Sequence, residues 1–167
     1  MLKRILLIVL IILLAIQFIR PAKNIHTAPQ PNDISTVYAV PANVDSILVK
    51  ACNDCHSNNT RYPWYNNIQP VAWFLDNHVK DGKRSFNLNE FATYTAARKY
   101  DKMTEVKKQI EKDEMPLSSY TLIHTDAKLT DAEKQALINW SEGIRKQMEA
   151  KYPKDSLEKK RSPQPHT

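Results

Sequence analysis

Glycine is nearly absent from this chain: among 167 residues, only Gly82 and Gly143 occur. Loops that bind phosphate through backbone amides need several closely spaced glycines, so folds built on such loops are excluded. A turn-rich β architecture is disfavoured for the same reason, and no run of alternating β-branched residues predicts a strand. The sequence therefore predicts an all-α fold.

Apolar residues recur at helical spacing through the middle of the chain. This pattern predicts helices over residues 43–51, 70–82, 89–99 and 102–112. A last helix is expected to begin at the capping box Thr130-x-x-Glu133. The inward faces should be Val44, Ile47, Leu48 and Ala51; Val71, Phe74, Leu75, His78 and Val79; Met103, Val106 and Ile110; and Leu137, Trp140, Ile144 and Met148.

Three residues mark expected features of these helices. Pro70 suits a first helical turn because its missing N–H has no partner there in any helix. Gly82 is expected to end the helix that Pro70 begins. Gly143, inside the last helix, costs about 1 kcal/mol relative to alanine, which predicts that another helix approaches the backbone closely at this point.

The first twenty residues resemble an export signal. Lys3 and Arg4 precede an apolar run over residues 5–19, which orients the N-terminus toward the cytoplasm. As a helix the run reaches roughly 22 Å, less than the ~30 Å hydrocarbon core. No small-x-small cleavage site follows, which favours an uncleaved, single-pass inner-membrane anchor with a periplasmic domain. The alternative is a cleaved signal and a periplasmic protein.

Four regions follow from these observations. Residues 1–20 form a signal-anchor helix that contacts the lipid bilayer through residues 5–19, and residues 21–42, with four prolines, form a linker. Residues 43–150 form the domain, and residues 151–167 a basic tail that is expected to be disordered. The net charge of +6 lies largely near that tail, which alternatively offers a patch for acidic partners or anionic lipids. The basic residues form no nucleic-acid-binding motif.

The residues that carry chemistry are Cys52-Asn53-Asp54-Cys55-His56. Two cysteines at this spacing followed by histidine form the attachment signature of c-type haem: the thiols form thioethers with the porphyrin, and the histidine ligates the iron. A disulfide, a thioredoxin-like redox pair and a zinc site are the alternatives. The redox pair lacks a βαβ context, and zinc usually needs a second ligand pair.

Three residues are candidates for the second axial ligand of the iron in one such haem. Met115 lies in a loop before the last helix, and a thioether is the ligand of many electron-transfer cytochromes. His78 on an apolar helical face is the main alternative, and His124 on a loop is the third. Methionine and histidine at such positions also occur simply as packing residues.

Aromatic residues and one arginine near the motif are further candidates for a haem pocket. Arg61 is suited either to a haem propionate or to an ordinary surface position. The aromatic side chains are suited either to a haem pocket or to a core, and they are Tyr62, Trp64, Tyr65, Trp73, Tyr120 and Trp140.

The sequence resembles the bacterial haem-binding domain family, a group of exported c-type cytochrome-like proteins. The similarity spans about residues 44–145, and the N-terminal run ending at Pro21 also fits. The resemblance implies one covalent haem c, His56 as its proximal iron ligand, and a cytochrome c-like helical fold, but no defined reaction. The segments that carry it are Cys52–Asn58, Thr60, Tyr62–Tyr65, Gln69–Trp73, His78–Val79, Gly82, Asn87–Phe91, Met115–Leu117, Tyr120, His124 and residues 129–140.

Two functional hypotheses with haem and one without haem follow. The first is a single-haem electron carrier, not an enzyme, that exchanges electrons with redox partner proteins in the membrane or periplasm. The second is a haem-based sensor or peroxidase-type protein with an open or displaceable sixth ligand, although no acid–base pair beside the motif is evident. A disulfide-stabilised interaction module is the alternative without haem.

Overall fold

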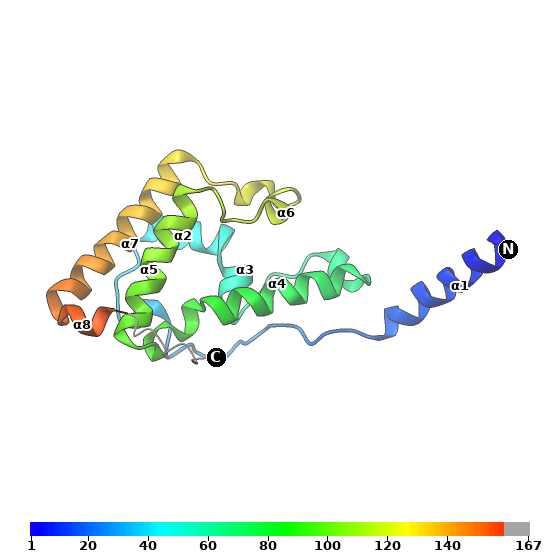
Figure 1. Cartoon of the computed structure of the whole chain (residues 1–167), viewed down its shortest axis with the longest axis horizontal. Coiled ribbons are helices and arrows are strands. Elements are labelled where there is room, and N and C mark those ends of the chain that lie inside the picture. The colour runs from blue at the N-terminus through cyan, green and yellow to red at the C-terminus, as the bar shows by residue number, and fades with distance from the viewer. Residues whose placement is uncertain (159–167) are drawn as a thin grey trace, which may run out of the picture. The chain divides into compact units, whose positions relative to one another are not determined.

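The computed structural model describes residues 1–158, and within that range the prediction of an all-α fold is confirmed (Figure 1). The only β-type pairing among these described residues is an isolated bridge between Ile25 and Asn59. The α-helices are α1 (Leu2–Ala15), α2 (Ala42–Ala51), α3 (Asn53–His56), α4 (Val71–Ser85), α5 (Ala96–Glu111), α6 (Ser118–Thr121), α7 (Asp131–Lys151) and α8 (Lys154–Leu157). The 3₁₀ helices are η1 (Ile16–Phe18), η2 (Ile34–Thr36), η3 (Trp64–Asn67), η4 (Leu88–Thr93) and η5 (Thr125–Ala127).

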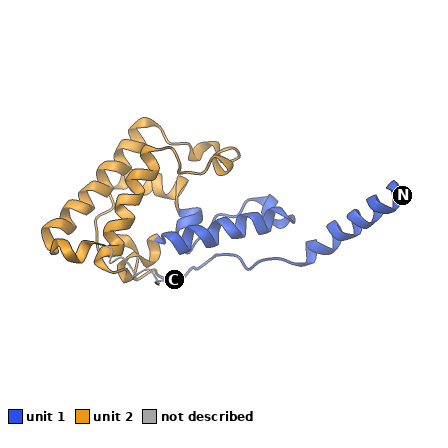
Figure 2. Ribbon diagram, viewed as in Figure 1, with its two compact units in different colours: residues 1–29, 53–87 blue, residues 30–52, 88–167 orange. Residues whose placement is uncertain are grey.

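The chain divides into two compact units, which Figure 2 colours separately. Unit 1 consists of residues 1–29 and 53–87 and contains α1, α3 and α4. Unit 2 consists of residues 30–52 and the chain from residue 88 onward, and contains α2 and α5 to α8. The chain therefore leaves unit 2 after Cys52 and enters unit 1 at Asn53.

In unit 2, α7 packs against both α5 and α2, and it begins where the capping box predicts. The Glu133 amide donates to the Thr130 hydroxyl at 3.3 Å, and the Thr130 amide donates to the Glu133 carboxylate at 2.9 Å. The same carboxylate pairs with Lys50 of α2 at 2.6 Å. Residues of the predicted apolar stripe are buried, namely Leu137, Trp140, Ile144 and Met148.

The prediction of two helices over 89–99 and 102–112 is wrong. Leu88–Thr93 form η4, and α5 is one continuous helix. It begins after Thr95 because this N-cap hydroxyl accepts a hydrogen bond from the Arg98 amide at 3.3 Å. The polar residues at 99–102 interrupt the apolar pattern, but none is a glycine or proline, so they do not break the helix.

The two glycines have roles other than those predicted. Gly82 does not end α4, which continues to Ser85. A Cβ at Gly82 would lie 2.4 Å from the Cys55 carbonyl oxygen, so it is here that two helices approach closely. A Cβ at Gly143 would meet nothing within 4 Å, so the close approach expected there is absent. Periodicity alone does not reveal which glycine faces a neighbouring backbone.

The interior of unit 1, all of whose residues are described, is mainly polar. Its buried apolar residues are Ala72, Val79 and Phe86. Its buried polar residues are more numerous, namely Asp54, Ser57, Asn66, Gln69 and Asn87. A body this small with so little apolar burial depends on hydrogen bonds and on additional apolar material for its stability.

The N-terminal apolar run and the C-terminal segment are helical for most of their described residues. The N-terminal apolar run forms α1 and η1, and no helix among residues 1–158 is both long enough and apolar enough to cross a membrane. The disordered tail expected over 151–167 is wrong for residues 154–157, which form α8, and Leu157 in that helix is buried. Residues 159–167 lie outside the described residues.

Candidate functional site

The Cys52–His56 segment joins two consecutive helices. Cys52 is the C-cap residue of α2, and its amide donates to the Leu48 carbonyl at 2.9 Å. Cys55 and His56 lie in α3, a single turn that starts at Asn53. Both cysteines are half-buried thiols. The motif therefore begins at the non-helical cap residue between the two helices, Cys55 lies within α3, and His56 ends that short helix.

The imidazole of His56 is held by the main chain. Its Nδ1 lies 2.8 Å from the carbonyl oxygen of Phe86, just after α4. A carbonyl oxygen only accepts hydrogen bonds, so Nδ1 carries the proton and donates it. The neutral tautomer with this arrangement has its lone pair on Nε2, the nitrogen that can ligate a metal. Histidines that ligate metals are commonly oriented in this way.

Close packing of α3 on α4 sets the position of that histidine. A Cβ on Gly82 would lie 2.9 Å from the Cys55 Cβ and 3.0 Å from its carbonyl carbon, in addition to the 2.4 Å contact with its oxygen. Only glycine permits this approach, since distances under 3.0 Å to backbone atoms cannot be relieved by rotating a side chain. Gly82 and Phe86 are one helical turn apart, so one end of α4 supports both Cys55 and His56.

The loop after the motif is fastened to Asp54, the residue between the two cysteines. The Asp54 carboxylate is almost completely buried and accepts hydrogen bonds from the Arg61 amide at 2.9 Å and its guanidinium at 3.2 Å. The Thr60 hydroxyl donates to the Asp54 carbonyl at 2.7 Å. The sequence suits Arg61 either to a haem propionate or to an ordinary surface position. In the structure its half-exposed guanidinium forms an ion pair with Asp54.

The protonation of Cys55 bears on the alternative of a redox thiol pair. Burial, and secondarily the Asp54 carboxylate, raise the pKa of the Cys55 thiol to about 11. Reactive redox cysteines have a lowered pKa because the thiolate is the nucleophile. The environment of Cys55 thus works against thioredoxin-like chemistry.

The three candidates for a second axial ligand lie in different elements. His78 is on α4, one turn before Gly82, with its ring centroid 4.2 Å from that of Phe74 and its Nδ1 2.8 Å from the Phe74 carbonyl. Met115 is half-buried in the turn after α5, in unit 2. His124, also in unit 2, stacks on Tyr120 at 4.4 Å. The choice among the three stays a prediction.

The aromatic residues separate into distinct environments. Trp140 is a core residue of unit 2, and its indole N–H donates to the Ala39 carbonyl at 3.1 Å. Trp64 in unit 1 is 75% exposed. The Tyr62 hydroxyl accepts a hydrogen bond from the Asn24 amide at 2.7 Å. Of these three aromatic residues, only Trp140 belongs to a protein core in this structure.

Two functional contacts of this site were not predicted. The Phe86 carbonyl gives no signal in a sequence, because every residue carries the same group. Asp54 lies between the two cysteines, but neither its residue type nor its position predicts that its carboxylate is buried against Arg61.

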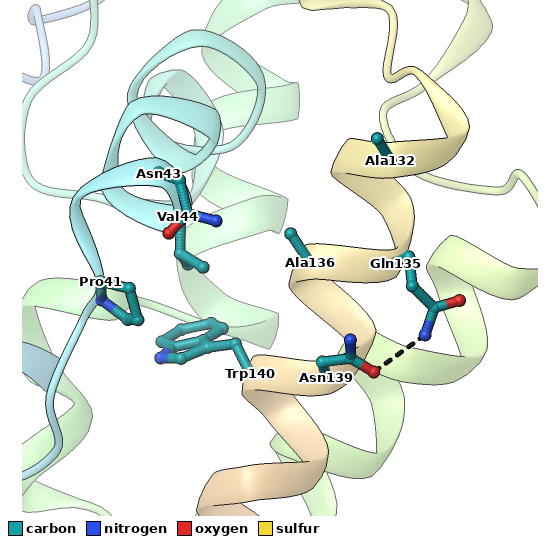
Figure 3. Close-up of a pocket in the computed structure, with 8 residues that line it drawn as sticks. All are labelled: Pro41, Asn43, Val44, Ala132, Gln135, Ala136, Asn139 and Trp140. Carbon is teal, nitrogen blue, oxygen red and sulfur yellow. Dashed lines mark hydrogen bonds between the residues drawn. The ribbon is translucent and has the colours of Figure 1, made fainter.

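An open surface pocket of about 550 Å³ in unit 2 has a different character (Figure 3). Pro41, Asn43 and Val44 lie on its α2 side, and Trp140 on its α7 side. No lining residue is an acid, a base or a cysteine; the others are Ala132, Gln135, Ala136 and Asn139. Its lining offers packing surface and amides but no reactive group.

The donor chemistry of the motif fits a haem. Cys52 and Cys55 are the two thiols that thioether attachment needs, and His56 has the tautomer of an iron ligand. The sparse apolar interior of unit 1 also fits a body completed by an apolar cofactor. Among residues 1–158, no three histidine, cysteine, aspartate or glutamate side chains are grouped so that they could hold a metal ion by themselves.

Comparisons with known proteins agree with this chemistry. Part of the chain is 28% identical over 94 residues to a cytochrome c peroxidase, Ccp, of Escherichia coli (strain K12). The match covers 54% of this chain but 20% of that protein, so the chain spans only a fifth of the length of this curated relative. No solved structure matches the chain. A family model described as the haem-binding domain matches residues 11–143, and the chain belongs to this haem-binding domain family.

Proposed function

We propose that this protein is a c-type cytochrome that carries one haem, covalently attached to Cys52 and Cys55 and ligated by His56, and that it transfers electrons. The single observation that carries the proposal is the 2.8 Å contact from His56 Nδ1 to the Phe86 carbonyl. It orients the imidazole directly after two thiols at haem-attachment spacing. When bound, the haem supplies the one-electron redox chemistry.

The residues around the motif would have separate tasks. The Phe86 carbonyl holds a proton on Nδ1 and so increases the basicity of Nε2 toward iron. Gly82 allows α4 to support α3, and Asp54 with Arg61 holds the following loop in place. Met115 would supply the second protein ligand to the iron through its thioether, a ligand type that raises the reduction potential into the range of electron carriers. His78 and His124 are the alternatives.

The proposed location is the exported side of the inner membrane, with α1 in contact with the bilayer. Apolar side chains of α1 are exposed on every side, which suits lipid rather than water. Lys3 and Arg4 at its start favour a cytoplasmic N-terminus. Redox partners in the membrane or periplasm follow from this location.

A peroxidase-type function is the second candidate, and the observation that favours it is the similarity to a cytochrome c peroxidase. That similarity extends over a fifth of the named protein, so it bears on a shared haem-binding region rather than on a whole enzyme. Peroxide chemistry needs an open or displaceable sixth position on the iron and a group that moves protons.

Three measurements test these proposals. The protein, co-expressed with a cytochrome c maturation system, should give the pyridine haemochrome of one haem c, and Cys52→Ser with Cys55→Ser should abolish it. Electron transfer predicts a six-coordinate low-spin spectrum that Met115→Ala removes and His78→Ala leaves unchanged. A five-coordinate haem that binds carbon monoxide rapidly would refute the carrier and favour the sensor or peroxidase. Absence of covalent haem would refute both.

A further inference from the structure

Helix α1 belongs to unit 1 but has no apolar partner in it. None of its 14 residues is buried, and the exposed residues include leucine and isoleucine on all sides. Lys3 and Arg4 lie near its start, and Arg20 and Lys23 follow its end. A helix that is apolar all round and bounded by cations fits a lipid surface with anionic headgroups.

Two glutamines connect η1, which follows α1, to the segment that precedes α4. The Gln17 amide donates to the Gln69 carbonyl at 3.2 Å, and the Gln69 backbone N–H donates to the Gln17 side-chain oxygen at 2.9 Å. The Gln69 side chain, only 3% exposed, donates to the Ile19 carbonyl at 2.7 Å. Buried amides with this many partners are held in a defined position.

The chain is fastened again a few residues later, on the loop that follows the haem motif. The Asn24 side chain donates to the Ser57 carbonyl at 3.0 Å and to the Thr60 hydroxyl at 2.9 Å. The Thr60 amide donates to the Asn24 carbonyl at 2.9 Å. The Asn59 side chain donates to the His26 carbonyl at 2.7 Å. We call residues 17–26 the strap, because both of its ends are hydrogen-bonded to the 53–87 segment of unit 1.

Exposed apolar residues lie close to Gln17 and Gln69 in the sequence. Phe18 and Ile19, next to Gln17, are 90% and 61% exposed. Ile68, which precedes Gln69, is 44% exposed, and Val71, two residues after it, is 37% exposed. Trp64 in the preceding 3₁₀ helix is 75% exposed. We call these five residues the interfacial patch.

We propose that the interfacial patch lies in the headgroup region of the same bilayer that α1 enters, so that the strap fixes unit 1 on the membrane surface. The hydrogen bonds between Gln17 and Gln69 join the chain that follows α1 directly to the segment that carries Ile68 and Val71, which favours the lipid proposed for α1 as the occupant. Tryptophan is enriched at membrane interfaces, and Lys23, which lies on the strap 5.5 Å from the centre of the Tyr62 ring, is a cation that suits anionic headgroups. This inference rests on the proposed contact of α1 with lipid.

Lipid photolabelling tests the inference on the full-length, haem-loaded protein. The protein is reconstituted into vesicles of phosphatidylethanolamine and phosphatidylglycerol that contain a phospholipid with a diazirine near its headgroup. After illumination, labelled peptides are mapped by mass spectrometry. We expect label in residues 2–19 and also in the peptide that contains Trp64, Ile68 and Val71.

Each outcome is informative. Label in α1 without label at 64–71 overturns the inference and leaves the anchoring proposal intact. No label in either segment refutes the anchoring itself. Gln17→Ala should remove label from 64–71 and keep it in α1, whereas the matched control Gln135→Ala on α7 should keep both. Unchanged label at 64–71 in a Gln17→Ala protein with a wild-type haem spectrum overturns the role of the strap.

Discussion

Substituting Gly82 by alanine tests how the haem motif is supported. The new Cβ would lie 2.4 Å from the Cys55 carbonyl oxygen, while ordinary contact begins at 3.4 Å, so α4 must retreat from α3 by about 1 Å. That movement is enough to stretch the 2.8 Å hydrogen bond between His56 and the Phe86 carbonyl beyond the ~3.5 Å limit of such bonds. The substitution therefore affects both the stability of the fold and the electronics of the iron ligand.

The expected magnitude is the balance of two effects. Overpacking against backbone atoms costs up to about 3 kcal/mol. Alanine in place of glycine within a helix returns about 1 kcal/mol. The net loss is about 2 kcal/mol, which lowers the unfolding midpoint by roughly 4–8 °C for a chain of this size. Loss of the bond to Nδ1 makes His56 a weaker donor to iron, so the reduction potential of the haem should rise.

Thermal unfolding and redox titration of the haem-loaded protein measure both effects, and the chain contains its own control. Gly143→Ala introduces the same methyl group where nothing lies within 4 Å, so it should be neutral or stabilise α7 by up to about 1 kcal/mol and leave the potential unchanged. A Gly82→Ala protein as stable as wild type, with an unaltered potential, would refute the reasoning.

Three further outcomes are expected. Hydrogen bonds from Lys50 and from Thr130 lower the pKa of Glu133. Glu133→Gln should therefore reduce the free energy of unfolding by about 1 kcal/mol at neutral pH. Urea unfolding should show that this difference disappears as the pH falls below 4.5, the ordinary pKa of glutamate. In the haem-free protein, the raised pKa of Cys55 predicts that the free energy of unfolding falls as the pH rises from 9.0 toward about 11. The reason is that the thiol of the unfolded chain loses its proton at a lower pH than the thiol of the folded chain. A Cys55→Ser protein should lack this fall. Asp54→Asn should destabilise the protein by about 1–2 kcal/mol through its lost bonds to the Arg61 guanidinium, whereas the exposed Asp81→Asn should change the unfolding midpoint little.

Those parts of the fold that depend on local signals were predictable. The capping box at Thr130 and Glu133 gave the start of α7, and the apolar spacing after Asn43 gave α2. The boundary inside residues 89–112 was missed because the competing signals, a threonine cap and a polar stretch, are both weak. The role of Gly82 was missed because a close contact depends on which elements pack together, and sequence spacing on one helix does not contain that information.

The candidate site was predictable in its reactive residues and not in its support. Cys52, Cys55 and His56 follow from covalent chemistry at fixed spacing. The Phe86 carbonyl that orients His56 is a main-chain group 30 positions away, and only the packing of α4 on α3 brings it there. The fastening of residues 17–26 to the motif loop was missed for a related reason, since prolines and polar residues predict a linker but not what it contacts.

The polar interior of unit 1 has a consequence for how the protein matures. Unit 2 contains a substantial apolar core, whereas the buried apolar side chains of unit 1 amount to an alanine, a valine and a phenylalanine. We therefore expect unit 2 to fold early and the segment 53–87 to gain its full protection from solvent late. Cys52 is the C-cap of α2 in unit 2, so it would already be in place when haem is attached. Helix α3, which carries Cys55, would still open readily at that stage. Attachment of the cofactor would be the event that completes folding, rather than a modification of a finished protein.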